Sequence, residues 1–202
     1  MSTEEGMDSE RVMMRTLEDQ ATWFAEIQKY LVAAACDLFG AYGVPVQHSF
    51  GGAVDTRGQS VMSVLGYGAE SVRGSVVLLT SRHVVDVLRP AELQASGLAT
   101  EDVLLRDVLG EFANMLLGRV KNKLSTRSFA PMLATPTTVL GDDLALPAPR
   151  SGLSAWHRFA AAEGDIFVRL DATFEPHFAL DAAASSAAQP MREGDVFLFP
   201  EG

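Results

Sequence analysis

Residues 107–118 read Asp-Val-Leu-Gly-Glu-Phe-Ala-Asn-Met-Leu-Leu-Gly, and this stretch sets the fold prediction for the whole chain. Asp107, Glu111, Asn114 and Gly118 recur at i, i+4, i+7 and i+11. On a helix that turns about 100° per residue, this spacing places them on one narrow line, which we call the polar stripe. The apolar residues cover a different arc: Leu104, Leu105, Val108, Leu109, Phe112, Met115, Leu116 and Val120. We predict a helix from about residue 100 to 124 that buries one side and presents two carboxylates and an amide on the other.

Composition limits the kinds of protein that this chain can be. It has 202 residues, 48% hydrophobic and 21% charged, which suits one domain with one core. The formal net charge of -10, without a basic cluster interleaved with aromatics, argues against nucleic acid or anionic membrane as a partner. The single cysteine, Cys36, fits a reducing compartment. No apolar run approaches the ~18 residues of a membrane span, so we expect a soluble, cytoplasmic protein.

The two ends of the chain have weaker patterns than the middle. Residues 1–16 are polar and weakly patterned, so we expect them to be disordered. Residues 181–190 are rich in Ala and Ser and predict a flexible linker, followed by a short apolar tail at 196–199. The expected division is a disordered segment at 1–16, a folded domain at 17–176, and a linker with tail at 177–202.

Within the folded part, helical and strand patterns alternate. Apolar residues recur at helical spacing from 18 to 39, and Gly40 and Gly43 offer a stop. Thr80 or Ser81 can cap a short helix. The expected strands are 60–67, 74–80, 130–140, 156–161 and 166–174, with turns at 68–71 and 163–165. We predict an α+β fold in which an antiparallel sheet built from hairpins packs with two long helices.

A coarse repetition is visible along the chain. A long helix, a proline-containing strand and a hairpin occur once before residue 80 and again after residue 100. When the two helices are matched, Glu26 falls opposite Glu111, but Lys29 stands where Asn114 would be. The fold can therefore contain an internal pseudo-repeat in which only the second helix carries the amide.

The polar stripe has an ordinary explanation, the solvated face of an amphipathic helix, and a functional one. Asp107 and Glu111 at i, i+4 repel by ~0.2 to 0.5 kcal/mol, and Gly118 costs ~1 kcal/mol relative to alanine. A purely structural helix would gain by replacing them. The set therefore favours function, with Gly118 clearing space for something large.

The chemistry open to such a stripe is narrow. It has no adjacent Ser, Cys, Lys or His to act as a nucleophile. The four histidines lack ligand or triad spacing: His48, His83, His157 and His177. An amide can, however, orient a water for phosphoryl transfer, where catalysis is mostly positioning and charge stabilisation. A flat helix face suits a protein substrate that brings its own phosphoryl group and metal.

A family resemblance joins these observations. The pattern Asp107-x3-Glu111-x2-Asn114-x3-Gly118, followed by Pro136, resembles the signature of the CheX/CheC family of chemotaxis phosphatases. The hairpin from residue 64 to 79 is similar to the one that precedes the signature helix in that family. A single complete motif is more like CheX than CheC, and the resemblance implies a CheC-like fold.

The resemblance also implies an activity, hydrolysis of the aspartyl phosphate of a CheY-type receiver domain in two-component signalling. Asn114 would orient the attacking water, and Glu111 would pair with the receiver's active-site lysine. Asp107 and Gly118 would be contact and clearance positions. Lys121 beside the stripe has two interpretations, a solvated lysine or a contact with the receiver's acidic surface. Mg²⁺ would belong to the receiver, so we expect no metal or cofactor bound by this chain. A homodimer joined at sheet edges is also implied.

A second hypothesis stays open, a non-catalytic module that docks on receivers or motor-switch components through the same face. Glu111 serves both readings, whereas Asn114 is needed mainly by the enzyme. The segment 142–154 and everything past residue 175 exceed what the family pattern leads us to expect.

Overall fold

A computed structural model describes residues 2–51, 54, 58–89, 100–125, 131–176 and 178, with side chains from residue 13 onward. The elements are α1 Ser2–Ala41, β1 Gln47–Phe50, β2 Gln59–Gly68, β3 Val72–Ser81, α2 Arg82–Leu88, α4 Glu101–Ser125, β4 Met132–Leu133, β5 Thr137–Asp142, β6 Leu153–Ala161 and β7 Gly164–Phe174. Within these described ranges, no helix combines the length and apolarity needed to cross a membrane.

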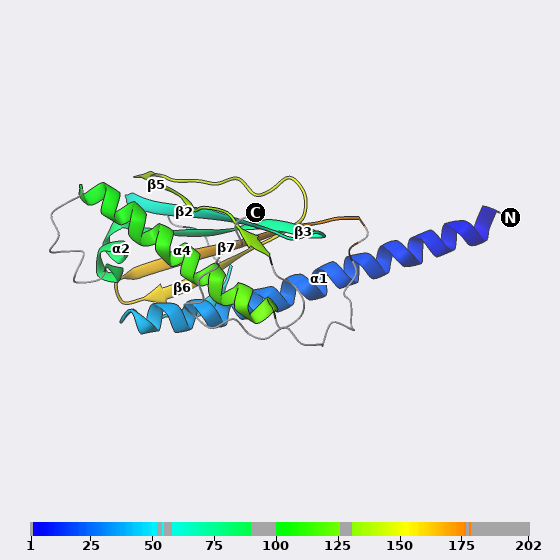
Figure 1. The fold of residues 1–202 in the computed structure, drawn as a ribbon, viewed down its shortest axis with the longest axis horizontal. Helices are drawn as coiled ribbons and strands as arrows, with labels where there is room; N and C mark the ends of the chain where they lie inside the picture. The colour runs from blue at the N-terminus through cyan, green and yellow to red at the C-terminus, as the bar shows by residue number, and fades with distance from the viewer. Residues whose placement is uncertain are drawn as a thin grey trace, which may run out of the picture.

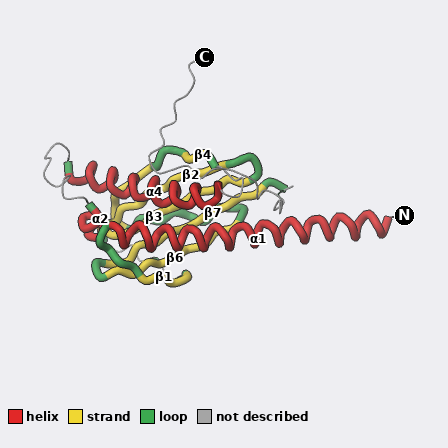
Figure 2. Tube along the Cα trace, turned by 60° about the horizontal axis from the view of Figure 1, so that its bottom comes forward, coloured by secondary structure: helices red, strands yellow, loops and turns green. Residues whose placement is uncertain are grey.

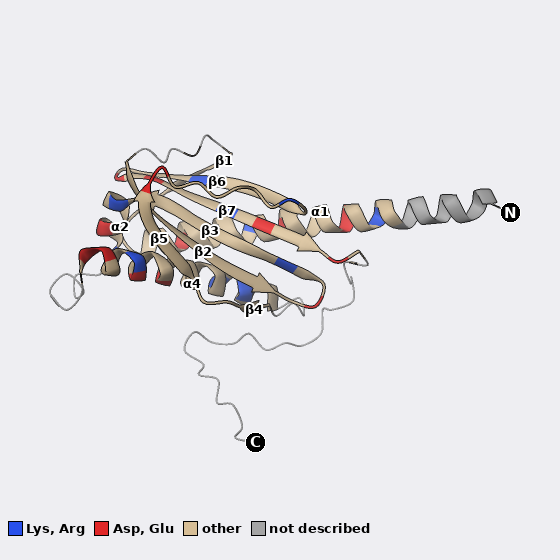
Figure 3. Cartoon of the chain, turned by 90° about the horizontal axis from the view of Figure 1, so that it is seen from above, with Lys and Arg blue, Asp and Glu red and all other residues tan. Residues whose placement is uncertain are grey.

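The strands form one antiparallel sheet. Its order is β1-β6-β7-β3-β2, and β4 and β5 both pair with the remaining edge of β2. The helices α1 and α4 lie side by side on one face (Figures 1 and 2). The segment between β5 and β6 crosses the opposite face (Figures 1 and 3). The predicted α+β class, an antiparallel hairpin sheet packed with two long helices, is confirmed.

The arrangement of the elements is symmetric about the centre of the sheet. Exchanging β1 with β5, β2 with β6 and β3 with β7 turns the order β1-β6-β7-β3-β2-β5 into its own reverse. The helices α1 and α4 run in opposite directions, as the same exchange requires (Figure 1). This symmetry agrees with the expected pseudo-repeat, but duplication of the sequence stays a prediction.

Helix α1 begins earlier than its sequence pattern indicated. It starts at Ser2, earlier than the predicted start near residue 18. The expected division at residue 16 stays a prediction. Trp23, Ile27 and Leu31 anchor the packed part in the core. Helix nucleation is costly and elongation is cheap, so a packed segment can extend a helix into solvent. The N-terminal part of α1 accordingly projects beyond the sheet (Figure 1).

Both predicted hairpins are confirmed. β2 pairs with β3, and β6 pairs with β7 across a turn at 162–163, slightly earlier than the predicted turn at 163–165. Ser81 is the N-cap of α2, because its hydroxyl accepts a hydrogen bond from the Val84 amide at 3.4 Å. Thr80, the alternative cap, donates its hydroxyl to the Asp165 carbonyl instead.

The single strand predicted at 130–140 is divided in two. β4 and β5 pair with β2 in registers that leave three residues, 134–136, opposite Leu65 and Gly66. Such an extra residue makes a β-bulge, and Pro136 falls where its missing N–H breaks the ladder. The predicted continuous strand was therefore wrong at this point, and the bulge places Pro136 against α4.

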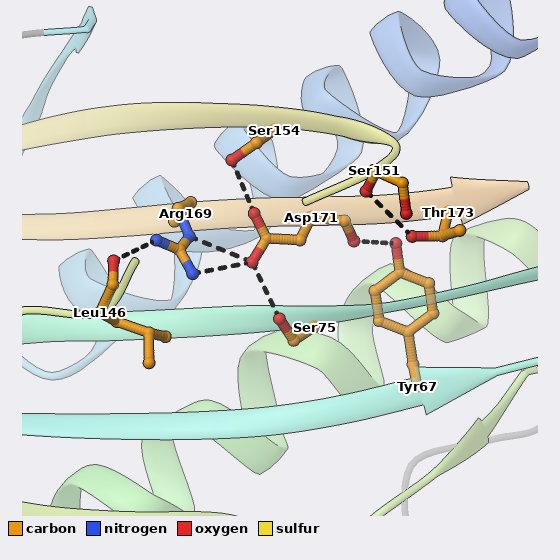
Figure 4. Close-up of polar contacts among 8 residues, drawn as sticks. All are labelled: Tyr67, Ser75, Leu146, Ser151, Ser154, Arg169, Asp171 and Thr173. Carbon is orange, nitrogen blue, oxygen red and sulfur yellow. Dashed lines mark hydrogen bonds and ion pairs between the residues drawn. The ribbon is translucent and has the colours of Figure 1, made fainter. Parts of the chain in front are cut away.

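The sheet face away from the helices holds a buried ion pair, Arg169 with Asp171 (Figure 4). Asp171 accepts hydrogen bonds from Ser154 at 2.6 Å, from Ser75 at 3.0 Å and from Arg169 at 3.0 Å. The third guanidinium nitrogen of Arg169, Nη1, donates to the Leu146 carbonyl at 2.8 Å. Since Leu146 belongs to the segment between β5 and β6, the predicted loop at 142–154 covers this face of the sheet.

The described part of the sheet ends in β1 on one side and in β4 and β5 on the other. The expected homodimer through sheet edges stays a prediction. The expected linker and tail at 177–202 lie outside the described residues except for Phe178, which packs on Trp23. The domain limits of 17–176 likewise stay a prediction.

Candidate functional site

The start of α4 is fixed by charged contacts with α2. Arg82 contacts Glu101 at 2.8 Å and Asp102 at 3.1 Å, and it also donates to Gln59 on β2. The two carboxylates form an acidic first turn of α4. Negative charge at a helix N-terminus is favourable because it faces the positive end of the helix dipole. Charged residues gather on α2 and the first turns of α4, whereas the strands carry few (Figure 3).

Helix α4 is covered on a wider arc than its apolar pattern predicted. Leu104 and Met115, expected in the core, are only half-buried, while Ala113 and Leu117 are also buried. The full set of buried residues is Leu105, Val108, Leu109, Gly110, Phe112, Ala113, Leu116, Leu117, Val120 and Leu124. The helix therefore packs on both sides and leaves a narrow accessible strip, along which the polar stripe runs.

The structure places all four residues of the polar stripe on this strip. Asp107 and Glu111 are exposed, and Asn114 and Gly118 are half-buried. Among the described residues, none forms a hydrogen bond or ion pair with the side chains of Asp107, Glu111 or Asn114. Lys121, one turn beyond the stripe, is half-buried. The placement on one helix is as predicted, and the roles assigned to these residues stay predictions.

Gly118 faces open space. A Cβ atom built on it would have no neighbour within 4 Å, other than its own helix backbone. Close packing against another element therefore does not explain this glycine. Clearance above the helix, the explanation favoured from the sequence, remains.

The stripe has a different neighbour on each side. Gly110 lies about 60° around the axis from Asp107, and Met115 about 80° in the other direction. A Cβ on Gly110 would lie 3.7 Å from Cγ of Pro136, so the bulge before β5 flanks the Asn114 side. On the Glu111 side, the Tyr42 hydroxyl lies 3.5 Å from Sδ of Met115. The sequence did not identify Tyr42, because only the fold brings the end of α1 to α4.

Two of the histidines that look scattered in the sequence meet in the structure. Nε2 of His48 on β1 lies 3.0 Å from Nδ1 of His157 on β6. Burial and, to a smaller extent, electrostatic repulsion from His48 lower the pKa of His157 to about 4. Both strands lie at the edge opposite β5, so the pair is not part of the stripe.

The described ranges contain no group of three His, Cys, Asp or Glu side chains that could hold a metal ion. The carboxylates of the stripe belong to no such group. That this chain carries no metal of its own therefore remains an expectation.

Comparison with solved structures identifies the fold first. The fold matches a CheC-like superfamily protein from Shewanella sp. PV-4 with a TM-score of 0.61 and 16% identity, over 73% of this chain and 97% of that one. It matches a chemotaxis protein CheX from Desulfovibrio desulfuricans with a TM-score of 0.60 and 20% identity, over 73% and 99%. It also matches the CheX–CheY–BeF₃–Mg²⁺ complex from Borrelia burgdorferi with a TM-score of 0.57 and 14% identity, over 71% and 96%. The chain has a CheC-like fold.

Sequence comparison then gives a match to one family. Residues 61–159 match the family described as chemotaxis phosphatase CheX, and this range contains the polar stripe and Pro136. The resemblance to the CheX/CheC family is thereby confirmed over residues 61–159. Among curated proteins, none matches this chain.

Proposed function

We propose that this chain hydrolyses the aspartyl phosphate of a CheY-type receiver domain. The observation that carries the proposal is the polar stripe, which presents two carboxylates and an amide with no partner in the described part of the chain. The CheX match supports it, as does the fold's similarity to a CheX solved with CheY, BeF₃ and Mg²⁺. The substrate in this proposal is a protein that brings its own phosphoryl group and Mg²⁺.

Asn114 has the central role in this proposal. Its amide holds a water in line with the phosphorus, so that the water oxygen forms the new bond as the bond to the aspartyl oxygen breaks and inorganic phosphate leaves. The half-buried position of Asn114 limits its motion, which suits a group that acts by positioning. Phosphoryl transfer of this kind needs no nucleophile from the helix.

The other stripe residues serve docking. Glu111 is exposed and pairs with the active-site lysine of the receiver. Asp107, one helical turn before Glu111, contacts the receiver surface. Gly118 admits the receiver surface, because nothing lies above it. Lys121 extends the contact to the acidic surface of the receiver.

The test is the decay of a phosphorylated, Mg²⁺-loaded CheY-type receiver from the same organism, with this protein added in substoichiometric amount. Phosphate should be released faster than from the receiver alone, and each molecule of this protein should act many times. Removing Mg²⁺ with a chelator should stop the effect, because the metal belongs to the substrate. Binding to the receiver without faster decay would support the non-catalytic module instead.

A further inference from the structure

The side chain of Tyr42 lies against α4, on the Glu111 side of the polar stripe. Its ring is 4.6 Å from that of Phe112, at an interplanar angle of 64°. Its hydroxyl donates to Sδ of Met115 at 3.5 Å, and Met115 follows Glu111 by one helical turn. Tyr42 is therefore a side neighbour of the stripe, contributed by the turn that follows α1.

The backbone at Tyr42 is fixed by the way α1 ends. The amide of Val44 donates to the Phe39 carbonyl at 3.0 Å, and the amide of Gly43 donates to the Gly40 carbonyl at 3.1 Å. Gly43 has a φ of 78°, so the three residues after Ala41 form a Schellman motif with a left-handed glycine. Phe39 and Val44, which accompany the motif, are both fully buried. The ring of Tyr42 is thus held in place before any partner arrives.

Tyr42 is nevertheless accessible at the surface, since 38% of the residue remains exposed. A large, rigid aromatic at the surface offers contact area at a low cost in conformational entropy. Tyrosines of this kind are enriched among residues that dominate protein interfaces. A ring that served only to cover Phe112 would not need this exposure.

The depth of the stripe explains why a partner must reach Tyr42. Asn114 and Gly118 are half-buried, whereas Tyr42 on one flank is exposed. A protein surface that contacts the Asn114 amide must therefore also contact the more exposed residues on either side of the stripe. On the Glu111 side, the flank includes Tyr42 and Met115.

We propose that Tyr42 is a receiver-binding residue, whose ring extends the docking surface beyond α4 onto the end of α1. This inference rests on the proposed function, and its occupant is the same CheY-type receiver. Tyr42 belongs to an element outside the range that matches CheX, residues 61–159. Because it does not touch the phosphoryl group, it contributes to affinity and not to the chemical step.

The experiment measures binding and turnover separately for Tyr42→Ala. The probe is the cognate receiver loaded with Mg²⁺ and beryllofluoride for Kd, and the phosphorylated receiver for kcat. We expect Kd to rise about tenfold, which corresponds to about 1.4 kcal/mol, with kcat within about twofold of wild type. Tyr42→Phe keeps the ring and should bind nearly as wild type does.

Phe50→Ala is the matched control. Phe50 is an exposed aromatic, 69% accessible, on β1 at the far edge of the sheet from β5. Its truncation should leave Kd unchanged. If Tyr42→Ala does not fold, hydroxyl-radical footprinting of the wild-type protein replaces it: Tyr42 should become protected when the loaded receiver binds, and Phe50 should not.

The outcomes separate this inference from the proposed function. Unchanged Kd for Tyr42→Ala, or no protection of Tyr42, would overturn the inference while wild-type turnover still supported the phosphatase. A loss of kcat at unchanged Kd would also overturn it. Failure of the wild-type protein to bind any receiver from the same organism would remove both proposals.

Discussion

Two carboxylates in this protein, Asp171 and Glu111, have opposite surroundings. Asp171 is buried on the sheet face away from the helices, where two serines and Arg169 donate to it. Glu111 is exposed on α4 and has no partner among the described residues. Asp171, which stabilises the fold, has all of its hydrogen-bond partners within the chain. Glu111, which we assign to binding a second protein, is left unpaired in the described part of the chain.

The same contrast extends to the residues around each carboxylate. Arg169 is 3% exposed, and its donors reach Asp171 and the Leu146 carbonyl, so the polar cluster is closed on itself. Buried charges need such closure, because each unpaired buried charge costs several kcal/mol. The side chain of Asn114 has no hydrogen bond to a described residue, yet Asn114 is only half-buried. Water can satisfy its amide until a partner displaces it.

The largest expected effect comes from breaking the closed cluster. Asp171→Ala leaves the Arg169 guanidinium buried without its counter-charge, which should lower the free energy of unfolding by ~3 to 5 kcal/mol. Urea unfolding measures this. Asp171→Asn, which keeps an acceptor for the serines, should lose less. A loss below about 1 kcal/mol for Asp171→Ala would show that the cluster contributes little to the fold.

Reversing the charge on the stripe should act on binding and not on folding. Glu111→Lys should raise the Kd for a beryllofluoride- and Mg²⁺-loaded receiver by at least about tenfold, because it opposes the receiver's lysine. The same change replaces the repulsion from Asp107 by an i, i+4 attraction of ~0.2 to 0.5 kcal/mol, so stability should not fall. Glu111→Gln is the control for loss of charge without reversal. Unchanged affinity in a titration of Glu111→Lys would remove the docking role.

The smallest effect concerns Gly118, and here stability and function should move in opposite directions. Gly118→Ala has open space and gains helix propensity, which should stabilise the fold by up to ~1 kcal/mol. For a domain of this size, that raises Tm by about 2 to 4 °C. Receiver affinity should fall, because the methyl group enters the cleared space. If Tm and affinity both rose, clearance would not be the reason for glycine at this position.

Local patterns in the sequence predicted the elements that are defined by their neighbours along the chain. The stripe helix, the β2–β3 hairpin and the Ser81 cap each depend on spacing within a few residues, and all three are confirmed. The helical extension of α1 to Ser2 was missed because it depends on propagation from a packed segment and not on its own pattern.

Contacts between distant segments could not be predicted in the same way. The pairing of β1 with β6 brings His48 to His157, and the end of α1 brings Tyr42 to Met115. Both contacts depend on how distant strands and helices are arranged in the fold. Hydrophobic periodicity along the chain does not give this arrangement. For the candidate site, the sequence therefore predicted the stripe but not its flank. The glycines that end α1, Gly40 and Gly43, were visible, but their effect on Tyr42 was not.

The most direct test of the unpaired stripe compares wild type with Asn114→Ala on one phosphorylated, Mg²⁺-loaded CheY-type receiver, with Kd and turnover measured separately. Removal of one preorganised catalytic group should lower turnover by roughly 10²-fold and leave Kd nearly unchanged. Equal loss of affinity and turnover, or turnover equal to wild type, would contradict the assignment of Asn114 as the residue that orients water.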